Sequence, residues 1–311
     1  MKKAVVVAGP TASGKSALAL ALAERFDGVV INADSMQVYR TLRVLTARPG
    51  PAEEARAPHR LYGILGPDEL CSAGRWRALA QAACDEAWAA GRLPVVTGGT
   101  GLYIRALVDG LSPVPEVPDD VRTATRRHFA ALGNVAFHAE LARRDPAMAA
   151  RLDPGNSQRL MRAWEVLEAT GRSLADWQAE PPADRLDARV FTVAVMPPRD
   201  ALYASCDQRF LAMLDGGALD EVRALMALNL DPSLPAMKAL GVAELIALAQ
   251  GRLARNEAVA AAQQATRRYA KRQLTWFRHQ LDIRCHLDAQ FSESFCDRIF
   301  ANIHGFLLTE G

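Results

Sequence analysis

The sequence predicts an α/β protein with a parallel sheet flanked by helices, interrupted by an all-helical insertion. Short apolar runs alternate with helical patterns, and a glycine-rich phosphate loop follows the first run. The segment 113–189 lacks any run typical of a strand. Strands that alternate with helices form parallel sheets with right-handed crossovers. Half of the 311 residues are hydrophobic, which is enough for a sizeable core.

The core is predicted from four buried strands. Residues 5–8 are all apolar and rich in valine, which indicates a parallel strand covered on both faces. Residues 17–26 then favour a helix, because they alternate leucine with alanine. Further apolar runs at 29–31, 93–97 and 190–195 predict the remaining strands. Residues 257–279 predict a long helix near the C-terminal end.

The predicted insertion is bounded by prolines. Pro113, Pro115 and Pro118 make a stiff entry, and Pro181-Pro182 lie near the exit. Between them, residues 121–132 and 158–169 have helical patterns. We therefore expect a catalytic core of residues 1–112 and 190–311 and a helical insertion domain of residues 113–189.

Composition narrows the class of protein. Lys and Arg number 37 against 35 Asp and Glu, so net charge alone does not indicate a nucleic-acid binder. The five cysteines show no CxxC pair or zinc spacing, which is typical of reduced thiols in a cytosolic protein. No run approaches the roughly 20 apolar residues of a membrane span. We expect a cytoplasmic protein without a membrane partner.

The segment 9–16 matches the phosphate-loop pattern GxxxxGK(S/T) in full. Its residues are Gly9, Pro10, Thr11, Ala12, Ser13, Gly14, Lys15 and Ser16. The glycines allow a tight turn that directs N–H groups into one concavity, and the following helix adds its positive end. Lys15 supplies charge for the outer phosphates, and the Ser16 hydroxyl can hold Mg²⁺. The pattern predicts a polyphosphate ligand, whether or not it belongs to a nucleotide such as ATP.

Asp34 directly follows the second strand, which places it at the same carboxyl edge of the sheet as the phosphate loop. It is a candidate base or metal ligand, with a helix N-cap or surface turn as the alternative. No strand ends in the aspartate typical of ATP-hydrolysing enzymes, because residues 93–97 run into glycine. The segment 98–103, which contains Thr100, either lets backbone approach a ligand or forms a plain helix entry.

Three clusters of basic residues lie on predicted helices. Any one of these clusters is most simply interpreted as a solvent-exposed helix face. Three clusters beside a phosphate loop favour a polyanionic partner. The clusters comprise Arg122, Arg126 and Arg127; Arg159 and Arg162; and Arg267, Arg268, Lys271, Arg272 and Arg278.

Five segments in order resemble the tRNA dimethylallyltransferase (tRNA isopentenyltransferase) family across nearly the whole chain. They are GPTASGKS at 9–16, DSMQVY at 34–39, GGTGLY at 98–103, the stretch 159–166 and RQLTWFR at 272–278. The resemblance implies a P-loop NTPase-like core with a tRNA-contacting helical insertion. It also implies transfer of a dimethylallyl group from dimethylallyl diphosphate to the exocyclic amine of the adenosine immediately 3′ of the anticodon, with Mg²⁺ and release of pyrophosphate. We expect a monomer.

The resemblance assigns roles by motif. Asp34 becomes the general base, residues 9–16 hold the diphosphate, and Ser16 contacts the metal. Thr100 and Arg223 are placed close to the leaving group. The implied contacts to the anticodon stem-loop of tRNA are Asp34, Ser35, Met36, Gln37, Thr100, Arg122, Gln158, Arg159, Leu160, Met161 and Arg162.

Three segments depart from the family pattern. VLTARP stands at 44–49 where IGTAKP is usual, PHRLYG at 58–63 where PHHLID is usual, and Gly241-Val242 where Gly-Tyr is common. None removes a proposed catalytic group. Three alternatives stay open: a small-molecule kinase that uses ATP, a prenyltransferase acting on free adenine nucleotides, and a non-catalytic RNA-binding module. The last leaves the intact phosphate loop unexplained.

Overall fold

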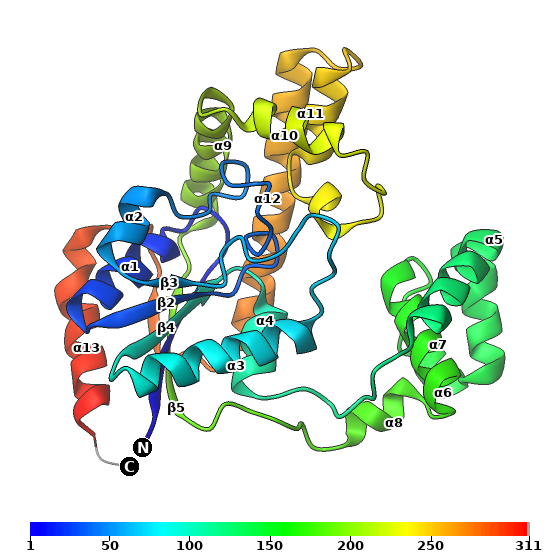
Figure 1. Ribbon diagram of the computed structural model, residues 1–311, viewed down its shortest axis with the longest axis horizontal. Helices are drawn as coiled ribbons and strands as arrows, with labels where there is room; N and C mark the ends of the chain where they lie inside the picture. The colour runs from blue at the N-terminus through cyan, green and yellow to red at the C-terminus, as the bar shows by residue number, and fades with distance from the viewer. Residues whose placement is uncertain (310–311) are drawn as a thin grey trace. The chain divides into compact units, whose positions relative to one another are not determined.

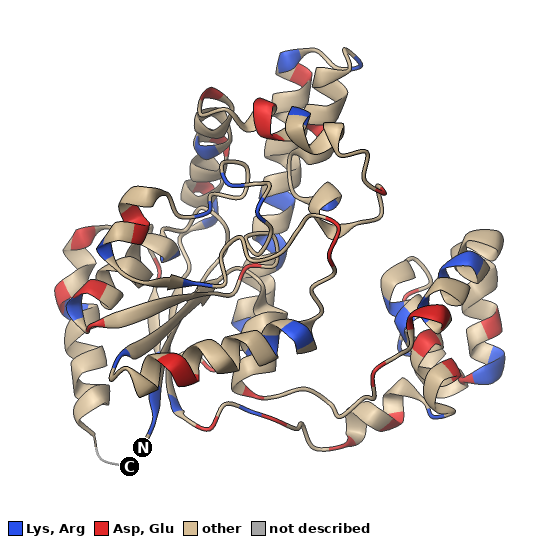
Figure 2. Cartoon of the chain, in the orientation of Figure 1, with Lys and Arg blue, Asp and Glu red and all other residues tan. Residues whose placement is uncertain are grey.

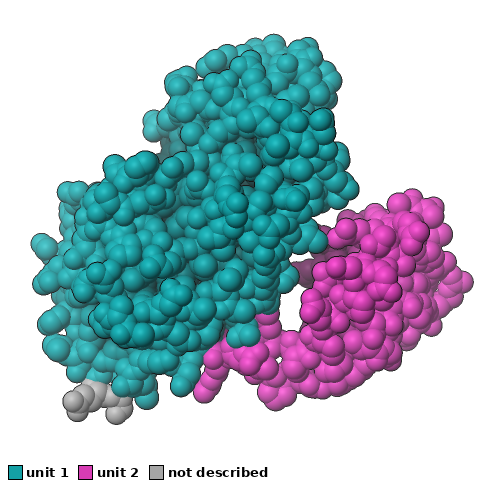
Figure 3. All heavy atoms as spheres, viewed as in Figure 1, with its two compact units in different colours: residues 1–108, 186–311 teal, residues 109–185 magenta. Residues whose placement is uncertain are grey.

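The computed structural model describes residues 1–309 and divides into two compact units (Figure 3). Unit 1 comprises residues 1–108 and the chain from residue 186 onward, and unit 2 comprises residues 109–185. The predicted insertion, 113–189, is therefore displaced by four residues at each end. The two units are described separately.

Unit 1 is built on a six-stranded parallel sheet in the order β3-β2-β4-β1-β5-β6. This confirms the predicted fold class. The four inner strands lie where apolar runs predicted them, whereas β3 and β6 are too short for a recognisable pattern. The strands are β1 (Lys3–Ala8), β2 (Gly28–Asn32), β3 (His59–Arg60), β4 (Leu93–Gly98), β5 (Arg189–Val195) and β6 (Cys285–Leu287).

Helices cover both faces of this sheet (Figure 1). In β1, Val5 and Val7 face α1 (Lys15–Arg25) and α13 (Cys296–Leu308). Val6 and its neighbours face α3 (Ala73–Ala89), α4 (Gly101–Val108) and part of α12 (Arg255–Gln280). A strand buried on both faces has no polar positions, which explains its continuous apolar run.

More helices lie beyond the carboxyl edge of the sheet (Figure 1). They are α9 (Arg199–Asp215), α10 (Ala218–Ala227) and α11 (Val242–Ala249), which pack with the N-terminal part of α12. At 26 residues, α12 is about 39 Å long, so it contacts both α9 and α4. Short elements complete the unit: α2 (Pro51–Arg56), η1 (Pro235–Lys238) and η2 (Glu293–Phe295).

Unit 2 is a small helical bundle with its own core. It contains α5 (Asp119–Arg144), α6 (Pro146–Ala149), α7 (Ser157–Thr170) and α8 (Leu174–Ala179). Helix α5 folds back at Gly133, whose φ of 72° suits glycine. Phe137, Leu141, Leu160 and Trp164 fill the space between α5 and α7. The only β pairing in this fully described unit is one isolated bridge between residues 111 and 183.

Among residues 1–309, no helix combines the length and apolarity that crossing a membrane requires. The five cysteines are all free thiols, and three of them are buried.

Candidate active site at the carboxyl edge of the sheet

The phosphate loop is the turn between β1 and α1, and its glycines are required by sterics. A Cβ on Gly9 would lie 2.6 Å from the Val195 carbonyl oxygen of β5. Gly14 has a φ of 89°, and its Cβ would lie 2.8 Å from Phe291. Ala12 also adopts a left-handed φ of 63°. Turns with such alternating conformations form concave sets of N–H groups that bind anions.

Two cations lie at this loop. Lys15 donates from Nζ to the Pro10 carbonyl oxygen at 3.3 Å. Burial lowers the pKa of Lys15 to about 8, the nearby Asp34 opposes this shift, and Arg209 reinforces it. Arg209 comes from α9 and donates to the Thr11 hydroxyl. Burial lowers the pKa of Arg209 as well. Both side chains are therefore desolvated cations, which gain strongly from an anionic ligand.

Sequence reasoning missed Arg209, although a signal was available. Cys206, Phe210 and Met213 form the buried face of α9, and Arg209 lies next to that face. A charged side chain placed on an apolar helix face is rare unless it has a partner. The pattern would have indicated a functional or structural arginine, without saying which.

Asp34 extends from the end of β2 and is held by a local turn. Its backbone N–H donates to Asn32 Oδ1 at 2.8 Å, and its Oδ1 accepts from the Met36 N–H at 2.9 Å. Asp34 lines a cavity of about 270 Å³ together with Thr11 and Arg209. The structure thus brings the predicted carboxylate and the phosphate loop to one cavity, as their positions at the same carboxyl edge of the sheet predicted.

This first cavity has a polar side and an apolar side. Its apolar side is formed by Leu45, Phe210, Met213 and Leu240. A second cavity of about 490 Å³ is lined by the loop residues Ala12, Gly14, Lys15 and Ser16, with Ala47, Ser205, Gln208, Ala212 and Gln290. Arg209 lines both cavities. A ligand with a charged head and a hydrocarbon tail suits such a pair of spaces.

The glycines of the segment 98–103 make room for protein. A Cβ on Gly98 would lie 2.1 Å from the backbone of Ala33, and one on Gly101 would lie 2.2 Å from the Trp276 ring. A Cβ on Gly99 would lie 2.3 Å from the Gln273 amide nitrogen. These glycines therefore let the segment 98–101 pack closely against the end of β2 and against α12. Helix α4 starts at Gly101, as the helix-entry alternative predicted.

Gln273 is a buried side chain that joins two parts of the site. Its Oε1 accepts from the Thr11 N–H at 2.8 Å, and its Nε2 donates to the Gly99 carbonyl at 2.8 Å. One amide thus holds the phosphate loop and the end of β4 at a set separation. The motif was recognised in the sequence, but this role was not predicted.

Thr100 supports the turn that carries Asp34. Its hydroxyl oxygen accepts from the Ser35 N–H at 2.9 Å and lies 3.2 Å from the Ser35 hydroxyl. Thr100 lines neither of the two cavities. Its side chain contacts Ser35 beside the carboxylate and also Tyr269, which lines the first cavity.

The structure gives no support to the placement of Arg223 close to the leaving group. Arg223 is exposed on α10, pairs with Asp220 at 2.9 Å and lines neither cavity. The cation at the phosphate loop is Arg209 instead. The placement came from a motif matched in sequence, whereas the direction of a helical side chain depends on how its helix packs.

The predicted RNA contacts of unit 2 lie on α5 and α7, with one correction. Leu160 is fully buried in the core of the unit, so its side chain is not available to RNA. Gln158 and Arg159 are exposed, while Met161 and Arg162 are partly exposed. Burial raises the pKa of Glu165, and the positive charges of Arg162, Arg122 and Arg126 oppose that shift.

Lys and Arg residues lie along α12, as the blue segments of Figure 2 show, and not all of their charges are available to a ligand. Arg267 donates to both carboxylate oxygens of Asp207 at 2.6 and 2.7 Å, so its charge is used within the protein. The others are exposed, and Arg272 lines the first cavity. These exposed residues are Arg268, Lys271, Arg272 and Arg278.

The donor set at the phosphate loop suits Mg²⁺. Ser16 is exposed at the start of α1 and lines the second cavity. Residues 1–309 contain no group of three or more His, Cys, Asp or Glu side chains able to hold a metal ion. Mg²⁺ commonly takes one or two protein oxygens and completes its shell with water and substrate phosphates. A single hydroxyl beside a phosphate-binding loop fits that mode of binding.

Comparisons with known proteins agree with this geometry. A family model described as IPP transferase matches residues 37–280, and one described as isopentenyl transferase matches residues 2–66. The tRNA dimethylallyltransferase of Paramagnetospirillum magneticum is 57% identical over 306 residues, 98% of this chain and 97% of the relative. That of Rhodospirillum centenum is 61% identical over 281 residues, 89% of this chain and 88% of the relative.

Solved structures give the same answer. The tRNA isopentenylpyrophosphate transferase of Bacillus halodurans matches with a TM-score of 0.70 and 31% identity, covering 99% of this chain and 96% of the other. A eukaryotic dimethylallyltransferase acting on tRNA matches with a TM-score of 0.82 and 25% identity, covering 99% and 80%. The chain belongs to the tRNA dimethylallyltransferase family of transferases.

Proposed function

We propose that this chain transfers the dimethylallyl group of dimethylallyl diphosphate to the exocyclic amine of the adenosine 3′-adjacent to the anticodon in tRNA, releasing pyrophosphate. The observation that carries the proposal is one cavity shared by the Asp34 carboxylate and the cation Arg209 at the phosphate loop. The names of the relatives support it, and none of those reported above is a kinase or an enzyme of free nucleotides.

The residues divide the chemistry between them. As the amine nitrogen attacks the allylic carbon, the carbon–oxygen bond breaks and its electron pair stays with the pyrophosphate. Lys15, Arg209 and the loop N–H groups stabilise this negative charge, the largest kind of catalytic contribution. Asp34 accepts the proton that the amine loses, and a positioned base of this kind accelerates a reaction by about 10²- to 10⁴-fold.

The apolar side of the cavity protects the reacting carbon. Leu45, Phe210, Met213 and Leu240 offer no hydroxyl or amine. A hydrocarbon chain held against them loses its contact with water, and an allylic carbon that carries positive charge is then shielded from hydrolysis.

Ser16 would hold Mg²⁺, which supplies positive charge to the leaving pyrophosphate. Its hydroxyl is a neutral oxygen, so most of the charge that neutralises the metal comes from the substrate. This explains why the loop needs no acidic cluster.

The RNA is recognised in part by charge. The adenosine amine is inaccessible in a stacked loop, so the base must be extruded at a cost of a few kcal/mol. Phosphate contacts from the exposed arginines of α12 and, in unit 2, from Arg122, Arg159 and Arg162 offset that cost. Gln158 and Met161 lie on α7 with Arg159 and Arg162 and extend this RNA-contacting surface. Ser35, Met36 and Gln37, which follow Asp34, contact the extruded base. We infer a cytoplasmic monomer.

Mass spectrometry of nucleosides tests the reaction itself. After incubation of unmodified tRNA with the enzyme, Mg²⁺ and dimethylallyl diphosphate, we expect one adenosine per tRNA to gain a five-carbon unit. Free AMP, ADP and ATP should not be modified at the same concentration. Consumption of ATP without any modified adenosine would instead support a kinase.

Asp34→Asn keeps the size of the side chain and removes the proton acceptor. We expect kcat to fall by about 10²- to 10⁴-fold. The Kd for tRNA should stay within threefold of the wild-type value, because the phosphate contacts are unchanged. Single-turnover kinetics and filter binding measure the two quantities. A variant with near-normal kcat would remove Asp34 as the base.

Lys15 gives the donor complex a pH dependence. Because its pKa in the free protein is about 8, the ammonium is charged below that pH and loses its proton above it. Binding of an anion favours the charged form, so kcat/KM for dimethylallyl diphosphate should be level below pH 8 and fall up to tenfold per unit above it. The Lys15→Ala variant should have a lower and flat profile over the same range. An unchanged fall in that variant would assign the titration to another group.

Arg209 and Arg223 make a matched pair of variants. Arg209→Ala removes a desolvated cation from the phosphate loop, and we expect kcat/KM for the donor to fall by about 10²-fold or more. Arg223→Ala removes an exposed side chain and should change the same constant less than twofold. Steady-state kinetics at varied concentrations of dimethylallyl diphosphate measure both constants. A larger loss in Arg223→Ala than in Arg209→Ala would support the role that the resemblance assigns to Arg223.

A further inference from the structure

Both cavities of the active site share one irregular wall, the turn of residues 42–48. Leu45 and Thr46 line the first cavity, and Ala47 lines the second. The turn closes on itself through the Ala47 N–H to the Val44 carbonyl and the Arg48 N–H to the Arg43 carbonyl, each at 2.9 Å. It belongs to neither a helix nor a strand, so its position depends on side chains from elsewhere in unit 1.

Glu221, in the first turn of α10, supplies the main attachment. Its Oε1 accepts from the N–H groups of Arg43 and Val44, each at 2.8 Å, and its Oε2 accepts from the Leu45 N–H at 3.0 Å. Three successive backbone donors thus converge on one carboxylate. Hydrogen bonds to an ionised acceptor are stronger than those between neutral groups, and successive N–H groups form a concavity suited to an anion.

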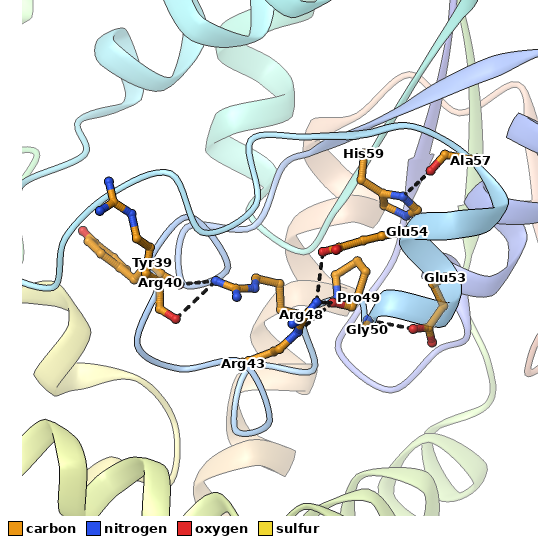
Figure 4. A network of polar contacts seen from close by, with 10 residues as sticks. All are labelled: Tyr39, Arg40, Arg43, Arg48, Pro49, Gly50, Glu53, Glu54, Ala57 and His59. Atoms are coloured by element: carbon orange, nitrogen blue, oxygen red, sulfur yellow. Dashed lines mark hydrogen bonds and ion pairs between the residues drawn. The ribbon is translucent and has the colours of Figure 1, made fainter.

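The carbonyl groups at the other end of the turn have different partners. Gln37 donates from Nε2 to the Thr46 and Ala47 carbonyl oxygens at 2.8 and 3.0 Å. Arg48 donates to the Tyr39 carbonyl at 2.9 Å (Figure 4).

Arg43, at the start of the turn, donates to the Pro49 carbonyl at 2.7 Å and to Glu54 at 3.1 Å (Figure 4). All of these groups lie close in sequence to the turn. Glu221 is therefore the attachment that ties the turn to the distant helix α10.

The attachment is reinforced by packing. Leu42 and Leu45 are buried among Phe210, Val222 and Leu245, so the turn is pressed against the helices that carry the apolar side of the cavity. Packing alone allows sliding, whereas three directed hydrogen bonds fix the orientation of the backbone. The hydrogen bonds to Glu221 therefore hold Leu45 and Thr46 at one position along the helices.

We propose that Glu221 is a positioning residue for the transfer site, which acts through the N–H groups of residues 43–45 to fix the cavity wall beside Asp34. Glu221 itself lines neither cavity. The identity of the prenyl donor, dimethylallyl diphosphate, rests on the function proposed above. Glu221 lies two residues before Arg223 on the same helix.

Glu221→Gln tests the proposal with little change in side-chain size. A glutamine offers one acceptor oxygen, and its NH₂ group must face a backbone N–H, so at least one of the three hydrogen bonds is lost. Two controls separate positioning from stability. Asp220→Asn changes the adjacent exposed carboxylate, and Leu245→Ala destabilises the same helix cluster from a site that lines neither cavity.

We expect Glu221→Gln to raise the hydrogen-exchange rates of the amides 43–45 by tenfold or more at a temperature where all variants are folded. It should also lower kcat/KM for dimethylallyl diphosphate by about tenfold or more, because small displacements in a site are costly. The KM for tRNA should stay within twofold. Asp220→Asn should keep both the exchange rates of residues 43–45 and kcat/KM for dimethylallyl diphosphate within twofold of wild type. Leu245→Ala removes packing around the turn but leaves the three hydrogen bonds, so it should change both quantities less than Glu221→Gln does.

Two results would overturn the proposal. One is unchanged exchange at residues 43–45 in Glu221→Gln. The other is a loss of kcat/KM for dimethylallyl diphosphate in Glu221→Gln that is no larger than the loss in Leu245→Ala. Hydrogen exchange needs no substrate, so a wild-type enzyme that fails to prenylate tRNA contradicts the proposed function without deciding the attachment of the turn.

Discussion

One buried amide holds the active site together. The Gln273 side chain from α12 accepts from the Thr11 N–H of the phosphate loop and donates to the Gly99 carbonyl at the end of β4. Strands β1 and β4 are hydrogen-bonded neighbours, and the phosphate loop and the segment 98–101 follow them at the carboxyl edge of the sheet. A side chain inserted between those loops sets their separation, and a buried amide bonded at both ends has a defined orientation. Gly99 and Gly101 are needed because α12 approaches so closely, and Gly98 because the backbone of Ala33 does.

The second constraint is electrostatic. Lys15 and Arg209 lie together in a partly desolvated space, and burial lowers the pKa of each. Asp34 is the acidic group that favours the charged state of both. An arrangement with two cations and one carboxylate stores unfavourable desolvation energy that an anionic ligand relieves. The site is therefore suited to gripping a diphosphate before reaction and to holding pyrophosphate as it leaves.

Part of the first cavity's wall comes from helix α9 and from the turn of residues 42–48. Helix α9 supplies Phe210, Met213 and Arg209, and the turn at 42–48 supplies Leu45 and Thr46. Here the family's usual IGTAKP is VLTARP, and Arg48 takes the position of a lysine. Gly63 lies against this arginine, since a Cβ there would be 2.1 Å from its guanidinium. The departures at 48 and 63 thus match each other sterically.

The sequence alone determined the four inner strands of the sheet, the phosphate loop and the place of Asp34, because these depend on local pattern. Continuous apolar runs predict doubly covered strands, and parallel strands bring their carboxyl ends to one edge. The helical nature of the insertion was likewise predicted from periodicity. Only the tertiary structure decided that Arg209 reaches the loop, that Arg223 pairs with Asp220 and that Leu160 is buried. It also decided that Arg267 is neutralised by Asp207. The direction of a helical side chain depends on which face its helix buries, and that choice is made by packing between distant segments.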